Sequence, residues 1–215
     1  MNFLPHRLFV MTVALCTLVA SSPSVFATPL EPFAYPSSLL DAPATLTTPA
    51  GESARVGKPQ IVLEHTPMST LAKLVRSRIL KEGQGDFARQ LLCVQGTEHA
   101  RPVLAWFISS DNETVTEVQL QWAPKIIDSR VCRHLPASQL PIRLGKIGLG
   151  QSKDEVLKHL GEASHQADDG WMYWFSQRFL RNARNLQELE LNWLSVHFDE
   201  QGLVDKAFIS QVTNL

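Results

Sequence analysis

Short runs in which apolar and polar residues alternate predict the first strands of this chain. Residues 103–107 alternate in this way, and residues 116–122 do so again after a polar turn at 110–112. Because successive side chains of a strand point to opposite faces, Val118 and Leu120 share one face and the polar residues between them share the other. This pattern is typical of an antiparallel hairpin with one buried face.

The second half of the chain contains similar patterns. Residues 171–175 form an aromatic strand, residues 176–185 form a basic excursion, and residues 203–209 supply a last strand. Residues 189–193 and residues 194–198 both alternate, but the two runs are out of phase by one residue. A one-residue slip in a period of two predicts a β-bulge where these runs meet.

A short helix is predicted ahead of the first set of strands. Ser69 is its expected N-cap, and Leu71, Leu74 and Val75 fall on one helical face. Gly83 is expected to end it, because glycine readily takes the left-handed conformation that closes helices.

A second short helix is predicted at residues 153–160. Ser152 and Glu155 have the spacing of a capping box, and Gly161 supplies the end. Both halves of the chain thus have the order helix, strand, hairpin. The sequence predicts an α+β fold with helices packed on one face of an antiparallel sheet, formed by one module or by two tandem copies of it.

The N-terminus has the pattern of an export signal. An uncharged apolar run at residues 8–20 is too short to cross a membrane and is followed by small residues, so residues 1–27 are predicted to be removed near Ala27. Lipid attachment at Cys16 is an alternative that Leu15, just before it, disfavours. We expect a periplasmic or secreted protein with no transmembrane segment in its mature form.

Three regions are predicted after the signal. Residues 28–60 contain six prolines among small polar residues and are expected to form a disordered tether. Residues 61–135 and 136–215 are the first and second predicted α+β modules.

The two cysteines beyond the signal are predicted to form a disulfide. Cys93 and Cys132 are an even pair in an exported chain, and they lack the spacing of a metal site. Closing a loop of this length is worth roughly 4 kcal/mol when the entropy of the unfolded chain is considered.

Charge and motifs exclude several classes of function. The 20 basic and 21 acidic residues are nearly balanced, which argues against nucleic acid as a partner. The glycines of residues 145–152 approach a phosphate-binding loop, but Gln151 replaces the required lysine. The histidines are scattered and no nucleophile motif is present. The sequence therefore predicts no catalytic residue, no metal site and no cofactor.

Tryptophans on predicted strands mark a candidate protein-binding surface. Trp171 and Trp174 have opposite parity, so one of them faces the core and the other faces away. Outward aromatic residues often dominate the energy of protein interfaces. The candidate surface comprises Trp174, Trp193, Trp106, Trp122, Arg178 and Arg181.

Three stretches of the second half resemble a known family. They are I-G-L-G-Q-S-K-D-E-V-L-K-H-L-G-E-A from Ile147, W-M-Y-W-F from Trp171, and L-S-V-H-F-D-E-Q-G-L-V from Leu194. About residues 142–210 resemble the SmpA/OmlA (BamE) small outer-membrane lipoproteins and the wider fold of β-lactamase inhibitor proteins. The resemblance implies helices on an antiparallel sheet, a location in the bacterial envelope, and a scaffolding or inhibitory role.

These observations predict an exported, non-catalytic protein-binding module of the bacterial cell envelope, acting as a scaffold or adaptor for a protein partner. Two alternatives remain open. One is a secreted or periplasmic enzyme inhibitor that presents a turn such as residues 110–113, and the other is an exported enzyme with an unrecognised site.

Overall fold

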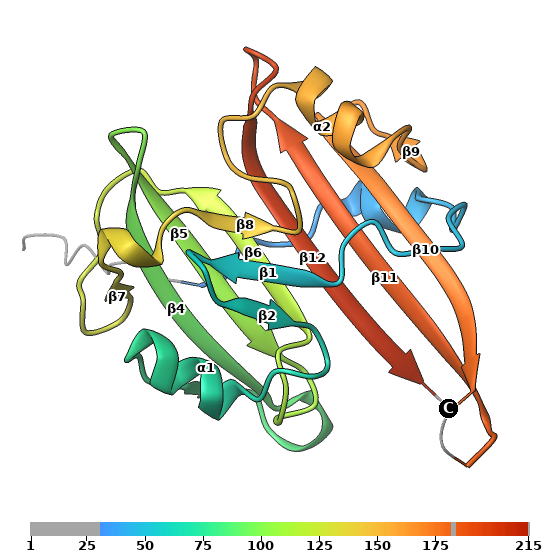
Figure 1. Cartoon of the computed structure of the whole chain (residues 1–215), viewed down its shortest axis with the longest axis horizontal. Coiled ribbons are helices and arrows are strands. Elements are labelled where there is room, and N and C mark those ends of the chain that lie inside the picture. The colour runs from blue at the N-terminus through green and yellow to red at the C-terminus, as the bar shows by residue number, and fades with distance from the viewer. Residues whose placement is uncertain (1–30, 182–183, 215) are drawn as a thin grey trace, which may run out of the picture. The chain divides into compact units, whose positions relative to one another are not determined.

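Strands make up most of the regular structure of this chain (Figure 1). The computed structural model describes residues 31–181 and 184–214, so the predicted signal peptide, Ala27 and Cys16 lie outside the described residues. The strands are β1 (Ser53–Val56), β2 (Gln60–Val62), β3 (Leu80–Glu82), β4 (Arg89–Glu98), β5 (Arg101–Ser109), β6 (Glu117–Trp122), β7 (Arg133–His134), β8 (Ile142–Leu144), β9 (His165–Gln166), β10 (Trp171–Arg181), β11 (Gln187–Phe198) and β12 (Val204–Asn214). The α-helices are α1 (Met68–Val75) and α2 (Lys153–Leu160), and the 3-10 helices are η1 (Ser37–Asp41), η2 (Gly85–Phe87) and η3 (Ala137–Gln139).

Nine strands form the main sheet. Its order is β3-β4-β5-β6-β12-β11-β10-β9, and β7 adds to β4 as the one parallel pair among the described strands. Strands β4, β5 and β6 form one antiparallel meander, and β10, β11 and β12 form another. Pairing of β6 with β12 joins the two meanders, so the sheet continues across the predicted boundary between the modules.

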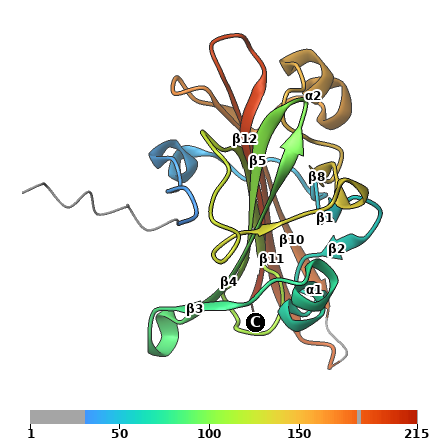
Figure 2. The ribbon, with the colours of Figure 1, turned by 90° about the vertical axis from the view of Figure 1, so that its left-hand side faces the viewer.

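A small sheet covers one face of the main sheet, which we call the inner face. This small sheet has the order β2-β1-β8 and lies on the same side as α1 and α2 (Figure 2). Its Val56, Ile61 and Leu144 are buried with Phe107 and Leu194 of the main sheet in one core. We call the opposite face of the main sheet the outer face.

The predicted fold, with helices packed on one face of a sheet, is wrong. Strands account for 45% of the structure and helices for 14%, and α1 and α2 have only eight residues each. The inner face is largely covered by a second sheet, so the fold is β-rich. The strands of that sheet have three or four residues, too few to show alternation in the sequence. No helix among the described residues is long and apolar enough to span a membrane.

Residues 31–60 belong to the folded unit and are not a disordered tether from residue 31 onwards. They contain η1 and β1, and β1 is the central strand of the small sheet. Leu46 also forms a parallel bridge with Ser176 of β10. The prolines prevent long elements but leave room for strands of a few residues between them.

The two helices show how far local signals determine an element. Helix α2 has the predicted bounds, and the Ser152 and Glu155 side chains both make the hydrogen bonds of the capping box. Helix α1 begins one residue before the predicted N-cap Ser69, behind Pro67, and no side chain caps it. It ends at Arg76, which takes the left-handed conformation, and not at Gly83.

The second meander differs from its prediction in two respects. Strand β10 continues through the predicted excursion as far as Arg181. The register of β11 against β12 is continuous at Trp193 and Leu194 and shifts between His197 and Phe198, so the predicted bulge was misplaced. Leu194 faces the inner core whereas Trp193 packs on the outer face. The one-residue slip in the alternation therefore has another cause: the apolar residues of β11 lie on its outer face before Leu194 and on its inner face from Leu194 onwards.

The predicted disulfide between Cys93 and Cys132 is confirmed. Both cysteines are buried, and their Cα atoms lie 4.7 Å apart. Cys93 lies in β4 and Cys132 immediately precedes β7, so the bond holds the short parallel strand against the main sheet.

Candidate protein-binding surface

Strand parity determines which side chains reach the outer face of the second meander. Met172 and Trp174 of β10 are buried in the inner core. Trp171 and Tyr173 pack together on the outer face, as their odd spacing predicts. The prediction that Trp171 and Trp174 face opposite ways is confirmed.

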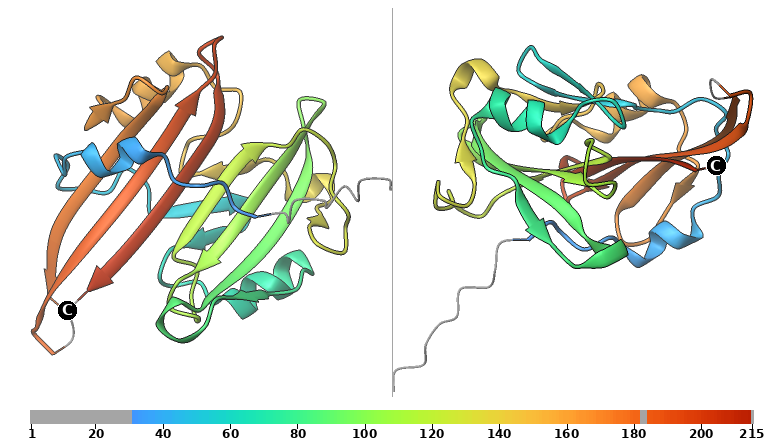
Figure 3. Two further views of the ribbon diagram at one scale, coloured as in Figure 1. Left: turned by 180° about the vertical axis from the view of Figure 1, so that it is seen from behind. Right: turned by 90° about the horizontal axis from the view of Figure 1, so that it is seen from below.

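The first described residues cover one end of the outer face. The left panel of Figure 3 views the molecule from behind and shows the chain around η1 crossing in front of β10, β11 and β12. Phe33 and Leu39 pack there against Trp171, Tyr173 and Phe208. The Phe33 and Trp171 ring centroids are 5.9 Å apart. This end of the outer face is therefore already occupied by the chain itself.

A buried carboxylate holds the covering segment in place. The Tyr35 hydroxyl donates a hydrogen bond to the Glu117 carboxylate, and Gln119 Nε2 donates to Glu117 Oε1 at 2.8 Å. Burial raises the pKa of Glu117, although these hydrogen bonds oppose the shift. Glu117 and Gln119 are 4% and 2% exposed, so the predicted solvent-facing side of this hairpin is in fact buried.

Farther along β10 and β11 the outer face carries apolar side chains that are half-buried, except for Phe179, which is exposed. Phe175 stacks on Trp193 with ring centroids 4.4 Å apart and planes 13° from parallel. Phe179 is 63% exposed and lies opposite Leu189 in the register of the two strands. We define the outer patch by these residues and their neighbours on the same face: Phe175, Phe179, Leu189, Leu191, Trp193 and Val212.

The outer patch borders a free strand edge. Leu46 occupies the edge of β10 with two backbone hydrogen bonds of 3.1 Å, donating to the Phe175 carbonyl and accepting from Gln177 N–H. The backbone groups of Phe179 and Arg181 point the same way, because their parity is the same. No backbone hydrogen bond to another described residue occupies them on that side. A row of unpaired backbone groups is a template for an added strand.

Two of the six residues that the sequence predicts to lie on the binding surface are buried in the structure. Trp106 is 1% exposed and Trp174 is fully buried, where its indole N–H donates to the Gly161 carbonyl oxygen at 3.2 Å. Neither ring can reach a partner without unfolding of the sheet. Trp122 is half-buried and stacks under the Arg101 guanidinium, 4.5 Å from the ring centroid, so it lies apart from the outer patch.

The two predicted arginines have different surroundings. Arg178 lies on the inner side, where Nη2 donates to Glu52 at 2.7 Å and to Glu190 at 3.0 Å. The bond to Glu190 raises the Arg178 pKa above its usual value, so this charge is neutralised within the chain. Arg181 is exposed at the end of β10 and donates to Asn185 at 2.7 Å. Of the six predicted residues, Trp193 and Arg181 lie at the outer patch.

Sequence reasoning missed most of the outer patch. The predicted basic excursion includes Phe179, although Phe179 continues the odd-numbered spacing of Trp171, Tyr173 and Phe175. That continuation was the available signal. The sequence predicts that Leu189 and Leu191 share one face of a strand, but the candidate surface predicted from the sequence does not include them.

The described residues include no group of three or more His, Cys, Asp or Glu side chains placed to hold a metal ion. Comparisons of the chain with protein-family models, with curated proteins and with solved structures found no match.

Proposed function

We propose that this chain is an exported, non-catalytic protein-binding module of the bacterial cell envelope, and that the outer patch contacts its partner. The observation that carries the proposal is the exposed end of the patch, where Phe179 is 63% exposed beside the stacked Phe175 and Trp193 rings. Contiguous exposed apolar surface on a folded chain commonly marks an interaction site. The predicted export signal supports a location in the envelope.

The proposed partner is a polypeptide with an extended segment. Such a segment can pair with the free backbone groups of Phe179 and Arg181 and place alternate apolar side chains on the patch. An acidic residue at its end would lie near the exposed Arg181. Main-chain pairing would supply affinity, and the rings would select the side chains.

Substitution of Phe179 tests the proposal. A photo-crosslinking residue at position 179 is expected to form adducts with an envelope protein, and Phe179→Asp is expected to weaken recovery of that protein at least about tenfold. The aspartate places an unpaired charge in the interface. Because Phe179 is largely exposed, the free energy of unfolding is expected to change by only about 0.5 kcal/mol.

Ile126 provides the matched control. It is also an exposed apolar residue, at 56%, but it lies in the loop between β6 and β7, away from the patch. Ile126→Asp is expected to leave recovery unchanged. Equal losses in both variants, or adducts from position 126 only, would rule out the outer patch as the binding surface.

One observation favours enzyme inhibition as a second candidate function. The exposed turn between β5 and β6 is held by Asp111, whose Oδ1 accepts from Ser109 Oγ at 2.7 Å and from Glu113 N–H at 2.8 Å. A rigid exposed turn suits insertion into an enzyme cleft, because little entropy is lost on binding. Inhibition of an envelope hydrolase that survives Phe179→Asp and is lost when residues 110–113 are replaced would favour this candidate.

A further inference from the structure

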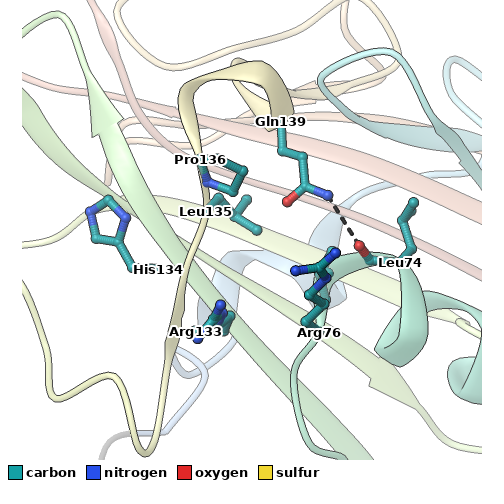
Figure 4. Close-up of a pocket in the computed structure, with 8 residues that line it drawn as sticks. Leu74, Arg76, Arg133, His134, Leu135, Pro136 and Gln139 are labelled. Atoms are coloured by element: carbon teal, nitrogen blue, oxygen red, sulfur yellow. Dashed lines mark hydrogen bonds between the residues drawn. The ribbon is translucent and has the colours of Figure 1, made fainter.

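A second candidate site lies at the end of α1, in a different part of the fold from the outer patch. A cleft of about 490 Å³ separates the last turn of α1 from β7 and η3 (Figure 4). The Gln139 side chain crosses from η3 and donates from Nε2 to the Leu74 carbonyl oxygen at 3.1 Å. This hydrogen bond joins the two walls, so the cleft is formed before any ligand arrives.

The charge lining the cleft is of one sign. Arg76 reaches it from the end of α1 and Arg133 from β7, and His134 also lines it with its ring directed away from Arg76 (Figure 4). None of the eight lining residues is acidic. Neither arginine forms an ion pair with a carboxylate in the part of the chain that the structure describes. By contrast, Arg178 and Arg143 elsewhere in the fold are both paired with glutamates.

The walls of the cleft are partly apolar. Leu74 is half-buried and Pro136 is exposed, and both line the cleft in front of Val75 and Leu135, which are only 2% and 1% exposed. A bare inorganic anion would contact the arginines but would leave the apolar walls in contact with water. A ligand that carries both an anionic group and an adjacent apolar group would use both features.

The backbone at Arg76 closes α1 and sets where its side chain leaves the helix. Arg76 ends α1 with φ of 53° and ψ of 42°, a left-handed conformation that favours glycine. The helix end already has the cation Lys73 in its last turn, so neutralising the helix dipole does not by itself require Arg76.

We propose that this cleft binds an acidic peptide segment, with Arg76 and Arg133 holding a carboxylate and Leu74 and Pro136 contacting the apolar side chain next to it. Arginine suits this role because its planar guanidinium donates two parallel hydrogen bonds to a carboxylate. The whole chain has a net charge of −1, so the attraction is local to the cleft and is not part of a general positive field. This inference does not depend on the outer patch.

Arg76→Gly separates binding from folding. Glycine takes the left-handed conformation without strain, so the melting temperature is expected to stay constant or rise, while the guanidinium is lost. The probe is a fluorescein-labelled Gly-Glu-Glu-Leu-Gly peptide, followed by fluorescence anisotropy. Arg76→Gly and Arg133→Gln are each expected to weaken its binding about tenfold or more. Lys73→Ala, which removes a cation from the same helix but outside the cleft, is expected to bind like the parent.

Two further probes define the ligand. The same peptide with glutamines in place of glutamates is expected not to bind, and inorganic phosphate is expected to compete weakly. Binding of the acidic peptide that is undetectable in the parent chain, or unchanged in both arginine variants, would overturn the proposal. Phosphate competing as strongly as the peptide would also overturn it, because the apolar walls would then contribute nothing.

Discussion

Removal of the Cys93–Cys132 disulfide provides a quantitative test of how this fold is stabilised. The bond joins residues separated by 39 positions and so closes a loop that spans β5 and β6. In the chain-entropy treatment, a loop of this length stabilises the folded state by roughly 4 kcal/mol at 25 °C. Because whole domains are stable by only about 5–15 kcal/mol, we expect the loss to be a large fraction of the total.

The folded structure around the bond should survive its removal. Leu135 N–H donates to the Gln95 carbonyl oxygen at 2.8 Å, and Gln95 Nε2 donates to the Cys132 carbonyl oxygen at 2.9 Å. These hydrogen bonds keep β7 beside β4 without the sulfur link. The predicted effect therefore arises mainly from the greater freedom of the unfolded chain.

The perturbation is the double variant Cys93→Ala with Cys132→Ala, measured by guanidinium and thermal unfolding with circular dichroism. The melting temperature is expected to fall by roughly 8–16 °C, given the entropy of unfolding of a domain of this length. The slope of the unfolding free energy against denaturant is expected to rise, because the unlinked unfolded chain exposes more surface. Reduced parent protein serves as the control and should match the double variant. A loss below about 1 kcal/mol, with an unchanged slope, would refute the loop-closure argument.

Two further predictions concern single side chains. Trp174→Ala is expected to lower the free energy of unfolding by about 3–5 kcal/mol, because the ring is fully buried in the inner core. Phe179→Ala should change the free energy of unfolding little, because this side chain is exposed on the outer patch. Equal melting temperatures for the two variants would contradict this assignment of faces. Partial burial of Asp111 opposes its ionisation, but hydrogen bonds from Thr114, Ser109 and Glu113 outweigh it and lower the Asp111 pKa. A lowered pKa in the folded state adds stability above the ordinary aspartate pKa, and that stability is lost as the pH falls through the lowered value. Asp111→Asn should therefore be less stable than the parent at pH 7, and the difference should shrink on acidification towards pH 2; a difference independent of pH would show that the charge of Asp111 contributes nothing.

The outer patch could be predicted only in part. Trp193 was recognised from its alternation with Leu189 and Leu191, and Arg181 from its position after the aromatic strand. The sequence alone does not exclude Trp106 and Trp174 from the candidate surface, because the spacing of a strand tryptophan is the same whether it faces the core or solvent. Their burial depends on what covers each face.

The cleft at the end of α1 was not predictable from local pattern. Arg76 and Arg133 are separated by more than fifty residues, and β7 has only two residues. Their proximity depends on parallel pairing of β7 with β4, which the Cys93–Cys132 bond supports. A sequence reading that pairs the cysteines constrains this region, but it does not give the register of a two-residue strand.

The sequence by itself determined features that depend on neighbouring residues. The capping box at Ser152 and Glu155 set the start of α2, and the parity of Trp171 and Trp174 set their opposite faces. Tertiary structure decided that the inner face is covered by β1, β2 and β8 and that part of the outer face stays uncovered. The physical reason is that periodicity records which residues share a face, while the burial of that face depends on segments distant in the chain. Those segments here are too short to leave a pattern of their own.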